Sequence, residues 1–384
     1  MTLSLPSLRR CLAGWMTCGM HWTRVAFAEV PFGADYKFEY YAEEGGRTRV
    51  STQAASVEAW INESVSVKGD FIYDAISGAT PLSGLPTEGS AQVPLVELRD
   101  TRRAGQLEFN WQGERQRLKP LFAYSLESDY ESISPALNWE IDFDRRNTTL
   151  LLGVAANWDD VFAATLNGRT EHKRTSDFLV GITQVLGPST VISANLTLGT
   201  ASGFLADPYK RVRFDLAPDG VLELERRPRH RSRQVIDLAL RHYVESLQSN
   251  AEFGYRFYHD SFGIFGNTAS GTWFQKMGKR WVLSPTVRYY QQTGAAFFAT
   301  QFAGDPSNPF LTDEFPVPDA YSSDYRLSRL HTWTYGVGLT VQVARHWHLN
   351  AAYKRYEMIG DDRMVASSNF PVANVYTLGM RFVF

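Results

Sequence analysis

The chain ends in an alternating stretch, Tyr376-Thr377-Leu378-Gly379-Met380-Arg381-Phe382-Val383-Phe384. Apolar or aromatic side chains fall on every second residue, and threonine, glycine and arginine occupy most positions between them. Because successive side chains of a β-strand point to opposite faces, this stretch predicts a strand with one apolar and one mainly polar face. A strand that crosses a bilayer needs this division, since one face meets lipid and the other meets the interior of a barrel.

The same two-residue period recurs through most of the chain. Trp333, Tyr335 and Val337, for example, alternate with Thr334 and Gly336. Many of these runs reach about 9–13 residues, the length required to cross a bilayer at a tilt, whereas strands of soluble proteins usually have five or six. We predict strands at residues 36–42, 48–60, 64–76, 104–112, 116–127, 134–143, 148–157, 173–185, 190–200, 234–247, 251–259, 269–277, 281–291, 329–342, 347–358 and 374–384.

The connections between these strands alternate in length. Every second one is tight, as at residues 113–115 and 248–250, and three of the others are very long, at residues 77–103, 201–233 and 292–328. Outer-membrane barrels have short periplasmic turns and longer extracellular loops, and an open sheet would leave backbone groups unpaired in lipid. The sequence therefore predicts an all-β fold, a closed antiparallel transmembrane β-barrel of about 16 strands with short periplasmic turns and long extracellular loops.

Composition excludes several other classes. The 384 residues contain 39 Lys plus Arg against 41 Asp plus Glu, so we expect no nucleic-acid partner, which would require a basic surface. The only two cysteines, Cys11 and Cys18, exclude a disulfide scaffold and a cysteine-ligated metal site. No stretch after residue 30 approaches the roughly 20 apolar residues of a membrane helix.

The two ends of the sequence carry export signals. Residues 1–28 are typical of a signal peptide, with Arg9 and Arg10 before an apolar stretch and a cleavage motif at Ala26-Phe27-Ala28, which leaves residues 29–384 for the barrel. A lipoprotein site at Cys18 fits poorly with the residues before it. At the other end, Gly379, Phe382 and Phe384 have the spacing of the insertion signal of outer-membrane proteins. This resemblance implies the barrel assembly machinery as a partner and the outer membrane of a Gram-negative bacterium as the location.

Several segments resemble one bacterial family. They are residues 73–79 (YDAISGA), 203–213 (GFLADPYKRVR), 255–260 (YRFYHD), 288–292 (RYYQQ) and 319–328 (DAYSSDYRLS). These segments are similar to the family designated domain of unknown function 3570, and the resemblance covers roughly residues 36–384. It implies an outer-membrane location, and it supplies no catalytic or binding residues that could be carried over to this chain.

Charged side chains on the second face of the strands are the candidate lining of the lumen. In a channel such residues set selectivity, whereas in a filled barrel they pair with one another. Both signs occur in similar numbers, which argues against strong ion selectivity. Small residues such as Gly254, Gly336, Gly338 and Gly379 on this face favour open volume. The candidates are Lys68, Asp70, Asp74, Glu140, Asp142, Arg241, Glu252, Arg256, Arg288, Lys354 and Arg381.

Two of the long loops have opposite charge. Arginine suits phosphate and carboxylate, so one hypothesis for loop 201–233 is that it binds lipopolysaccharide phosphates or an anionic solute; the alternative is that its cations pair with neighbouring acids. Loop 292–328 is acidic, and we weigh a calcium site against pairing with the basic loop or simple solvation. The basic residues are Lys210, Arg211, Arg213, Arg226, Arg227 and Arg229, and the acidic ones are Asp305, Asp313, Glu314, Asp319 and Asp324.

These features favour a passive outer-membrane channel or transporter for small polar or anionic solutes. The alternative is a structural or partner-binding barrel that anchors or sheathes another exported protein. We find no catalytic set and no motif for a cofactor or a metal, and therefore expect no enzymatic activity. The expected partners are outer-membrane lipid and lipopolysaccharide, with an exported protein in the alternative case.

Overall fold

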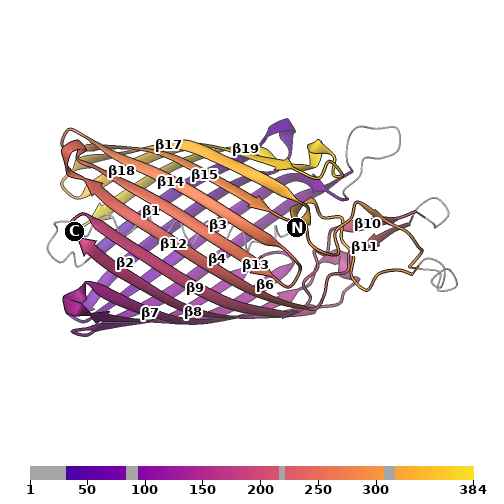
Figure 1. The fold of residues 1–384 in the computed structure, drawn as a ribbon, viewed down its shortest axis with the longest axis horizontal. Helices are drawn as coiled ribbons and strands as arrows, with labels where there is room; N and C mark the ends of the chain where they lie inside the picture. Colours follow the sequence, from indigo (N-terminus) through magenta and orange to yellow (C-terminus); the bar gives the residue numbers. More distant parts are fainter. Residues whose placement is uncertain (1–31, 84–93, 216–220, 307–315) are drawn as a thin grey trace.

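A computed structural model describes residues 32–83, 94–215, 221–306 and 316–384. Sixteen strands form the wall of a barrel (Figure 1). They are β1 (Phe32–Glu43), β2 (Arg49–Asn62), β3 (Val65–Pro81), β4 (Leu95–Gln112), β5 (Gln116–Leu126), β6 (Tyr130–Phe143), β7 (Thr148–Val161), β8 (Glu171–Gly187), β9 (Thr190–Gly203), β12 (His230–Val244), β13 (Ser249–Asp260), β14 (Phe265–Met277), β15 (Trp281–Gln292), β17 (Leu330–Ala344), β18 (Trp347–Gly360) and β19 (Val372–Val383).

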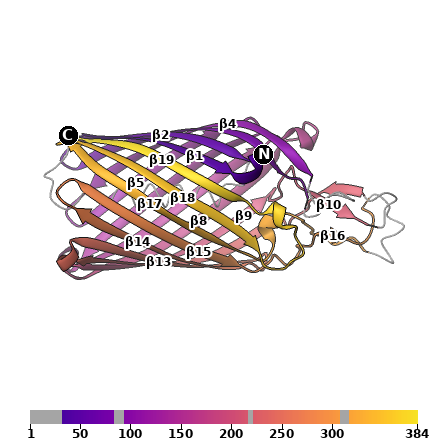
Figure 2. The same cartoon turned by 90° about the horizontal axis from the view of Figure 1, so that it is seen from above.

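The barrel closes between its first and last strands. Each wall strand pairs antiparallel with its neighbour along the chain, and β1 pairs with β19 from Gly33 opposite Val383 to Glu43 opposite Ala373. Closure gives every wall strand two partners, as a sheet that crosses lipid requires. Figures 1 and 2 show the strands tilted strongly against the barrel axis. The predicted closed barrel of 16 strands is confirmed.

All sixteen predicted strands coincide with wall strands, but several extend further at one end of the barrel. β3 continues to Pro81 and β4 already begins at Leu95, in a register that pairs Ser77 with Arg99. The predicted loop 77–103 was therefore too long. Glu97 and Arg99 both face outward and are strongly exposed. The alternation of apolar and polar residues therefore ends where this hairpin extends past the apolar outer surface of the wall, and the sequence pattern no longer indicates a strand there.

The outer face of the wall is apolar and the inner face is polar, as a barrel surrounded by lipid requires. Outward side chains such as Phe71, Phe253 and Leu378 are large, apolar and more than half exposed, whereas the inward Asp70 and Asp74 are buried. A soluble protein would place these side chains the other way round. The outward apolar surface is therefore the lipid-facing surface of a transmembrane barrel.

The predicted insertion signal lies in the closing strand. Phe382 packs on Trp347 with ring centroids 4.8 Å apart and on Phe32 at 6.4 Å, while the exposed Phe384 donates its backbone N–H to the Phe32 carbonyl. Phe382 and Phe384 thus form part of an aromatic cluster where the first and last strands meet.

A small second sheet lies beyond one end of the barrel, opposite the end that holds the carboxy terminus (Figure 1). It consists of β10 (Arg211–Phe214), β11 (Val221–Leu224) and β16 (Gln301–Phe302), in the order β11-β10-β16. Val212, Phe214 and Tyr321 are its fully or nearly fully buried core. We call the segments 204–229 and 293–329, which contain this sheet, the cap.

Short 3₁₀ helices complete the secondary structure of the described residues. They are η2 (Glu44–Gly46), η3 (Asp144–Arg146), η4 (Ala164–Leu166), η5 (Glu245–Leu247), η7 (Tyr325–Leu327) and η8 (Ser367–Asn369). Within the described part of the chain, none of the helices is long and apolar enough to cross a membrane. The predicted signal peptide, residues 1–28, lies outside the described residues.

The face assignment predicts opposite effects for two changes in β19. Leu378→Arg places a charge on the lipid face and should cost roughly 2–4 kcal/mol near the bilayer midplane. Arg381→Ala should leave insertion nearly intact, because Arg381 faces the interior beside Asp35. Heat-modifiable gel mobility of membrane fractions measures the folded share. Normal folding of Leu378→Arg together with loss of folding in Arg381→Ala would reverse the face assignment.

Candidate functional site

The strand register places all the predicted lumen residues on the inner face of the wall. Asp70, for instance, lies opposite Ser56 and Gln106, and Arg256 lies opposite Asp237 and Thr268, in registers that put the exposed apolar side chains on the other face. The same holds for Lys68, Asp74, Glu140, Asp142, Arg241, Glu252, Arg288, Lys354 and Arg381.

Inner charges of β5 and β6 form one connected group. Arg117 donates to Glu140 at 2.6 Å and to Asp142 at 3.0 Å, and Lys119 donates to Glu140 at 2.5 Å. Arg117 and Lys119 were not among the sequence-predicted candidates, because Pro120 and the polar first residues of β5 weaken its alternation. The cross-strand position opposite Glu140 is the signal that would have identified Arg117.

The same cross-strand pairing recurs around the wall. Across neighbouring strands, Arg241 contacts Glu252 at 2.9 Å and Arg381 contacts Asp35 at 2.7 Å, while Lys68 contacts Asp70 of its own strand β3 at 3.3 Å. Additional pairs join Arg256 to Asp237 and Arg102 to Asp74 on adjacent strands, and Arg233 of β12 to Asp177 of β8 across Gly199 of β9. Opposite charges on neighbouring strands offset part of the cost of removing each from bulk water.

Arg288 on β15 differs from these paired cations. Its guanidinium lies 5.7 Å from the centre of the Tyr290 ring, and the described residues place no carboxylate within ion-pair distance of it.

A hollow of about 280 Å³ lies on the inner face of another part of the wall. It is lined mainly by inward residues of β6 to β9, β12 and β13, among them Asn138, Asp177, Thr197 and Arg256.

The inward glycines do not leave the open volume that the sequence suggested. A Cβ added at Gly336 would lie 2.6 Å from the Lys354 Cγ, and one at Gly379 would lie 2.5 Å from the Asn350 side chain. Side chains of Ser270 and Ser284 likewise cover Gly254 and Gly338. That expectation was wrong at these positions, because each glycine makes room for a side chain of a neighbouring strand.

The six basic residues predicted in loop 201–233 differ in exposure. Lys210 and Arg227 are buried inside the cap, whereas the Arg229 side chain is 72% exposed. Arg211 and Arg213 are partly exposed on β10, and Arg226 stacks over the Tyr321 ring at 5.5 Å. The loop therefore does not present all its cations to solvent.

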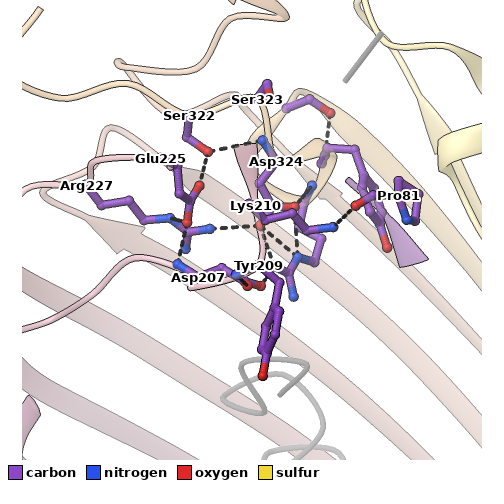
Figure 3. A network of polar contacts seen from close by, with 12 residues as sticks. Pro81, Asp207, Tyr209, Lys210, Glu225, Arg227, Ser322, Ser323 and Asp324 are labelled. Carbon is purple, nitrogen blue, oxygen red and sulfur yellow. Dashed lines mark hydrogen bonds and ion pairs between the residues drawn. The ribbon is translucent and has the colours of Figure 1, made fainter. Parts of the chain in front are cut away.

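Buried ion pairs join the two long loops of opposite charge (Figure 3). Arg227 contacts Asp324 at 2.8 Å, and Arg326 contacts Asp207 and Asp324, each at 2.5 Å. Glu225 accepts from the Asp207 backbone N–H and from the Ser322 hydroxyl. The hypothesis that the acidic loop pairs with the basic one is confirmed, and Asp324 is engaged in these pairs. Asp313 and Glu314 lie outside the described residues.

Lys210 connects this network to the wall hairpin β3–β4. Its ammonium donates to the Pro81 carbonyl (Figure 3), and the Arg211 backbone N–H donates to the Leu82 carbonyl at 3.1 Å. Burial lowers the pKa of Lys210 to about 8, although Asp324 opposes the shift. The Lys210 ammonium also lies 5.5 Å from the centre of the Tyr325 ring, so this lysine contacts both of the other predicted long loops.

The ionic network is balanced in charge. Asp207, Glu225 and Asp324 face Lys210, Arg227 and Arg326. Burial alone would raise the pKa of Asp324, but the adjacent Arg326 and Lys210 outweigh it and hold that pKa well below its usual range. Burial also raises the pKa of Glu225, against the opposing effect of Arg227.

The closed wall, its apolar outer belt and its charged interior define a bacterial outer-membrane β-barrel. The family model described as protein of unknown function (DUF3570) matches residues 20–169 and 157–368. The chain belongs to this family, which confirms the resemblance seen in the sequence. No curated protein matches the chain.

Solved outer-membrane barrels resemble the chain in fold. A bacterial polysaccharide outer membrane secretin is 8% identical with a TM-score of 0.51, over 93% of this chain and 100% of that one. CdiB from Acinetobacter baumannii is 9% identical with a TM-score of 0.52, over 93% and 61%. The siderophore receptor PirA from Pseudomonas aeruginosa is 9% identical with a TM-score of 0.44, over 92% and 62%. The chain thus spans less than two thirds of PirA and CdiB, and the likenesses to the secretin and to CdiB show the fold alone.

The buried network predicts that Asp324→Ala opens the cap while the wall remains folded. The change leaves Arg227 and Arg326 buried with one partner fewer, and breaking a buried pair costs about 3–5 kcal/mol. Ser323, which is 1% exposed, provides a reporter: Ser323→Cys should react slowly with a thiol reagent, and faster when Asp324→Ala is added. Arg229→Ala, at an exposed site of the other cap segment, is the control. Equal labelling rates in all three backgrounds would contradict the network's role.

The lowered pKa of Lys210 predicts how cap stability varies with pH. Between about pH 8 and pH 10.5 the folded cap holds Lys210 neutral while the unfolded segment still binds a proton. Stability therefore rises with pH through this window, by up to a few kcal/mol, and the burial cost is present in full below pH 8. A dye on Asp319→Cys, an exposed cap position, would report the denaturant midpoint of the cap. Lys210→Met should abolish the rise; an equal rise in that variant would exclude Lys210 as its source.

Proposed function

We propose that the protein is a passive channel for small polar or anionic solutes. The observation that carries this proposal is the charged inner face of a closed wall of sixteen strands. Barrels of 16–18 strands leave an aqueous channel where side chains or a plug do not fill it. Side chains such as Arg288 and Arg256 would then meet water and solute in the lumen.

The inner charges are distributed unevenly around the wall, which supports passage of polar solutes. The arc from β12 to β19 has a surplus of cations, and the arc from β2 to β8 has a surplus of carboxylates. Such an arrangement produces a field across the lumen that orients dipolar solutes and attracts anions to one side. The cations include Arg231, Arg233, Arg241, Arg256, Arg288, Lys354 and Arg381, against Asp237, Glu252 and Asp260; the acids include Glu58, Asp70, Asp74, Asp100, Glu108, Glu140, Asp142, Asp159 and Asp177, against Lys68, Arg102, Arg117, Lys119 and Lys173.

The hollow on the inner face of the wall is a candidate binding site for such a solute. Asp177, Asp237 and Arg256 supply charges at its edge, and Asn138 and Thr197 supply neutral hydrogen-bonding groups. A volume of about 280 Å³ lies near the lower limit of small-molecule pockets. Weak binding at a polar site of this kind suits conduction, because a solute must be able both to enter and to leave.

The cap favours the second candidate, a barrel that anchors or sheathes another exported protein. Its two segments are held to one another and to the β3–β4 hairpin by buried ion pairs and hydrogen bonds at one end of the barrel. A locked cap restricts that end, and it presents a folded surface to a partner. Co-purification of a stoichiometric partner without any conductance would support this candidate.

Conductance of the purified protein in planar bilayers tests the channel. We expect ion conductance and solute-dependent liposome swelling in the wild type. Arg288→Glu should move the reversal potential in a salt gradient toward cation preference, because Arg288 is a lumen cation without a paired carboxylate among the described residues. Arg280→Glu, at an exposed turn position, is the matched control. No conductance and no swelling in a correctly folded wild type would exclude the channel.

A further inference from the structure

Three carboxylates converge inside the cap end of the barrel wall. Asp100 lies near the start of β4, and Glu127 and Asp129 lie in the turn between β5 and β6. One carboxylate oxygen of each residue lies within 4.8 Å of the others, and the three residues are only 5–7% exposed. None of the three was among the sequence-predicted candidates, because they come from two separate segments that meet only in the folded sheet.

Hydrogen bonds do not fully satisfy the Asp100 carboxylate. Its Oδ1 accepts the backbone N–H groups of Thr101 and Ser128, at 2.7 and 3.2 Å. Its Oδ2 is buried and accepts no hydrogen bond, and no lysine or arginine of the described residues lies within ion-pair distance of Asp100. A buried carboxylate beside two others is costly to ionise unless positive charge joins it.

We propose that Asp100, Glu127 and Asp129 bind a divalent cation of the calcium class. Calcium takes six to eight oxygen ligands in flexible geometry, and carboxylates and backbone carbonyls are its usual protein donors. Magnesium demands near-ideal octahedral geometry and retains several waters, which suits a buried cluster less well. The cation would supply the positive charge that Asp100 lacks.

The site also contacts the cap. The Tyr209 hydroxyl donates to Asp129 Oδ2 at 2.5 Å, and the backbone N–H of Tyr209 donates to Asp207 Oδ1 at 3.0 Å. Figure 3 shows the Tyr209 ring directed away from the ionic network that Asp207 and Lys210 join. Tyr209 thus links the carboxylate cluster of the wall to the network of the cap. Binding of a cation would fasten the cap to the wall.

Calcium titration of the folded full-length protein in detergent, after treatment with a chelator, tests the site. We expect one calcium ion per chain by calorimetry and a loss of affinity of about tenfold or more in Asp100→Asn, because a charged ligand is removed. Glu97→Gln is the matched control, since Glu97 is an exposed acid on the same strand. A folded wild type that binds no calcium at millimolar concentration, or an Asp100→Asn variant that binds equally well, would overturn the proposal.

A second measurement separates loss of the site from loss of the fold. In chelator, Asp100→Asn should melt at or above the wild-type temperature, because it removes a buried charge whose Oδ2 atom accepts no hydrogen bond. Calcium should then raise the melting temperature of the wild type alone. A variant that melts below the wild type in chelator would show that Asp100 acts through structure and not as a ligand.

Tyr209→Phe tests the link to the cap. This variant keeps the three carboxylates and should bind calcium nearly as tightly as the wild type. Calcium should slow thiol labelling of Ser323→Cys in the wild-type background, and this protection should disappear with Tyr209→Phe. Equal protection in both backgrounds would mean that the cation does not act on the cap through Tyr209.

Discussion

Backbone hydrogen bonding between β1 and β19 is the constraint on which the whole structure depends. In the hydrocarbon core no water can pair with a free N–H or C=O group, so a strand edge exposed to lipid costs several kcal/mol per group. The register from Gly33 opposite Val383 to Glu43 opposite Ala373 removes that edge. Closure of the barrel also creates a lumen, and every second side chain of each wall strand points into this lumen.

The sequence was sufficient to predict the wall because lipid imposes one rule on all sixteen strands. Leu378 of β19 and Phe253 of β13 face lipid and are therefore apolar. Arg381 and Glu252, on the same two strands, fall on the alternate positions and face inward. A two-residue period in hydrophobicity therefore predicts both that a segment is a strand and which of its side chains face lipid or the lumen. The prediction was weakest at β3 and β4, whose ends extend beyond the apolar zone, where side chains such as Glu97 are no longer constrained to be apolar.

Contacts between distant segments could not be predicted in the same way. Opposite net charges suggested that the two long loops pair, but nothing in the sequence selects Arg326 as the partner of Asp207 or brings Lys210 to Pro81. The cluster of Asp100, Glu127 and Asp129 depends on strand register and on the path of a turn. The inward glycines were misjudged because their space is taken by neighbours, such as Asn350 over Gly379, that alternation alone does not reveal.

The contact between Lys210 and Pro81 has a consequence for the order of assembly. The two residues are 129 positions apart, and the strands between them must be in register before Lys210 can lose its water and reach the carbonyl. Asp324, which stabilises the charge of Lys210, follows more than a hundred residues later. Before the barrel is complete, a charged lysine has no favourable place to be buried. We therefore expect cap formation to be a late event in biogenesis, so that a closed cap would mark a molecule whose wall has already been built.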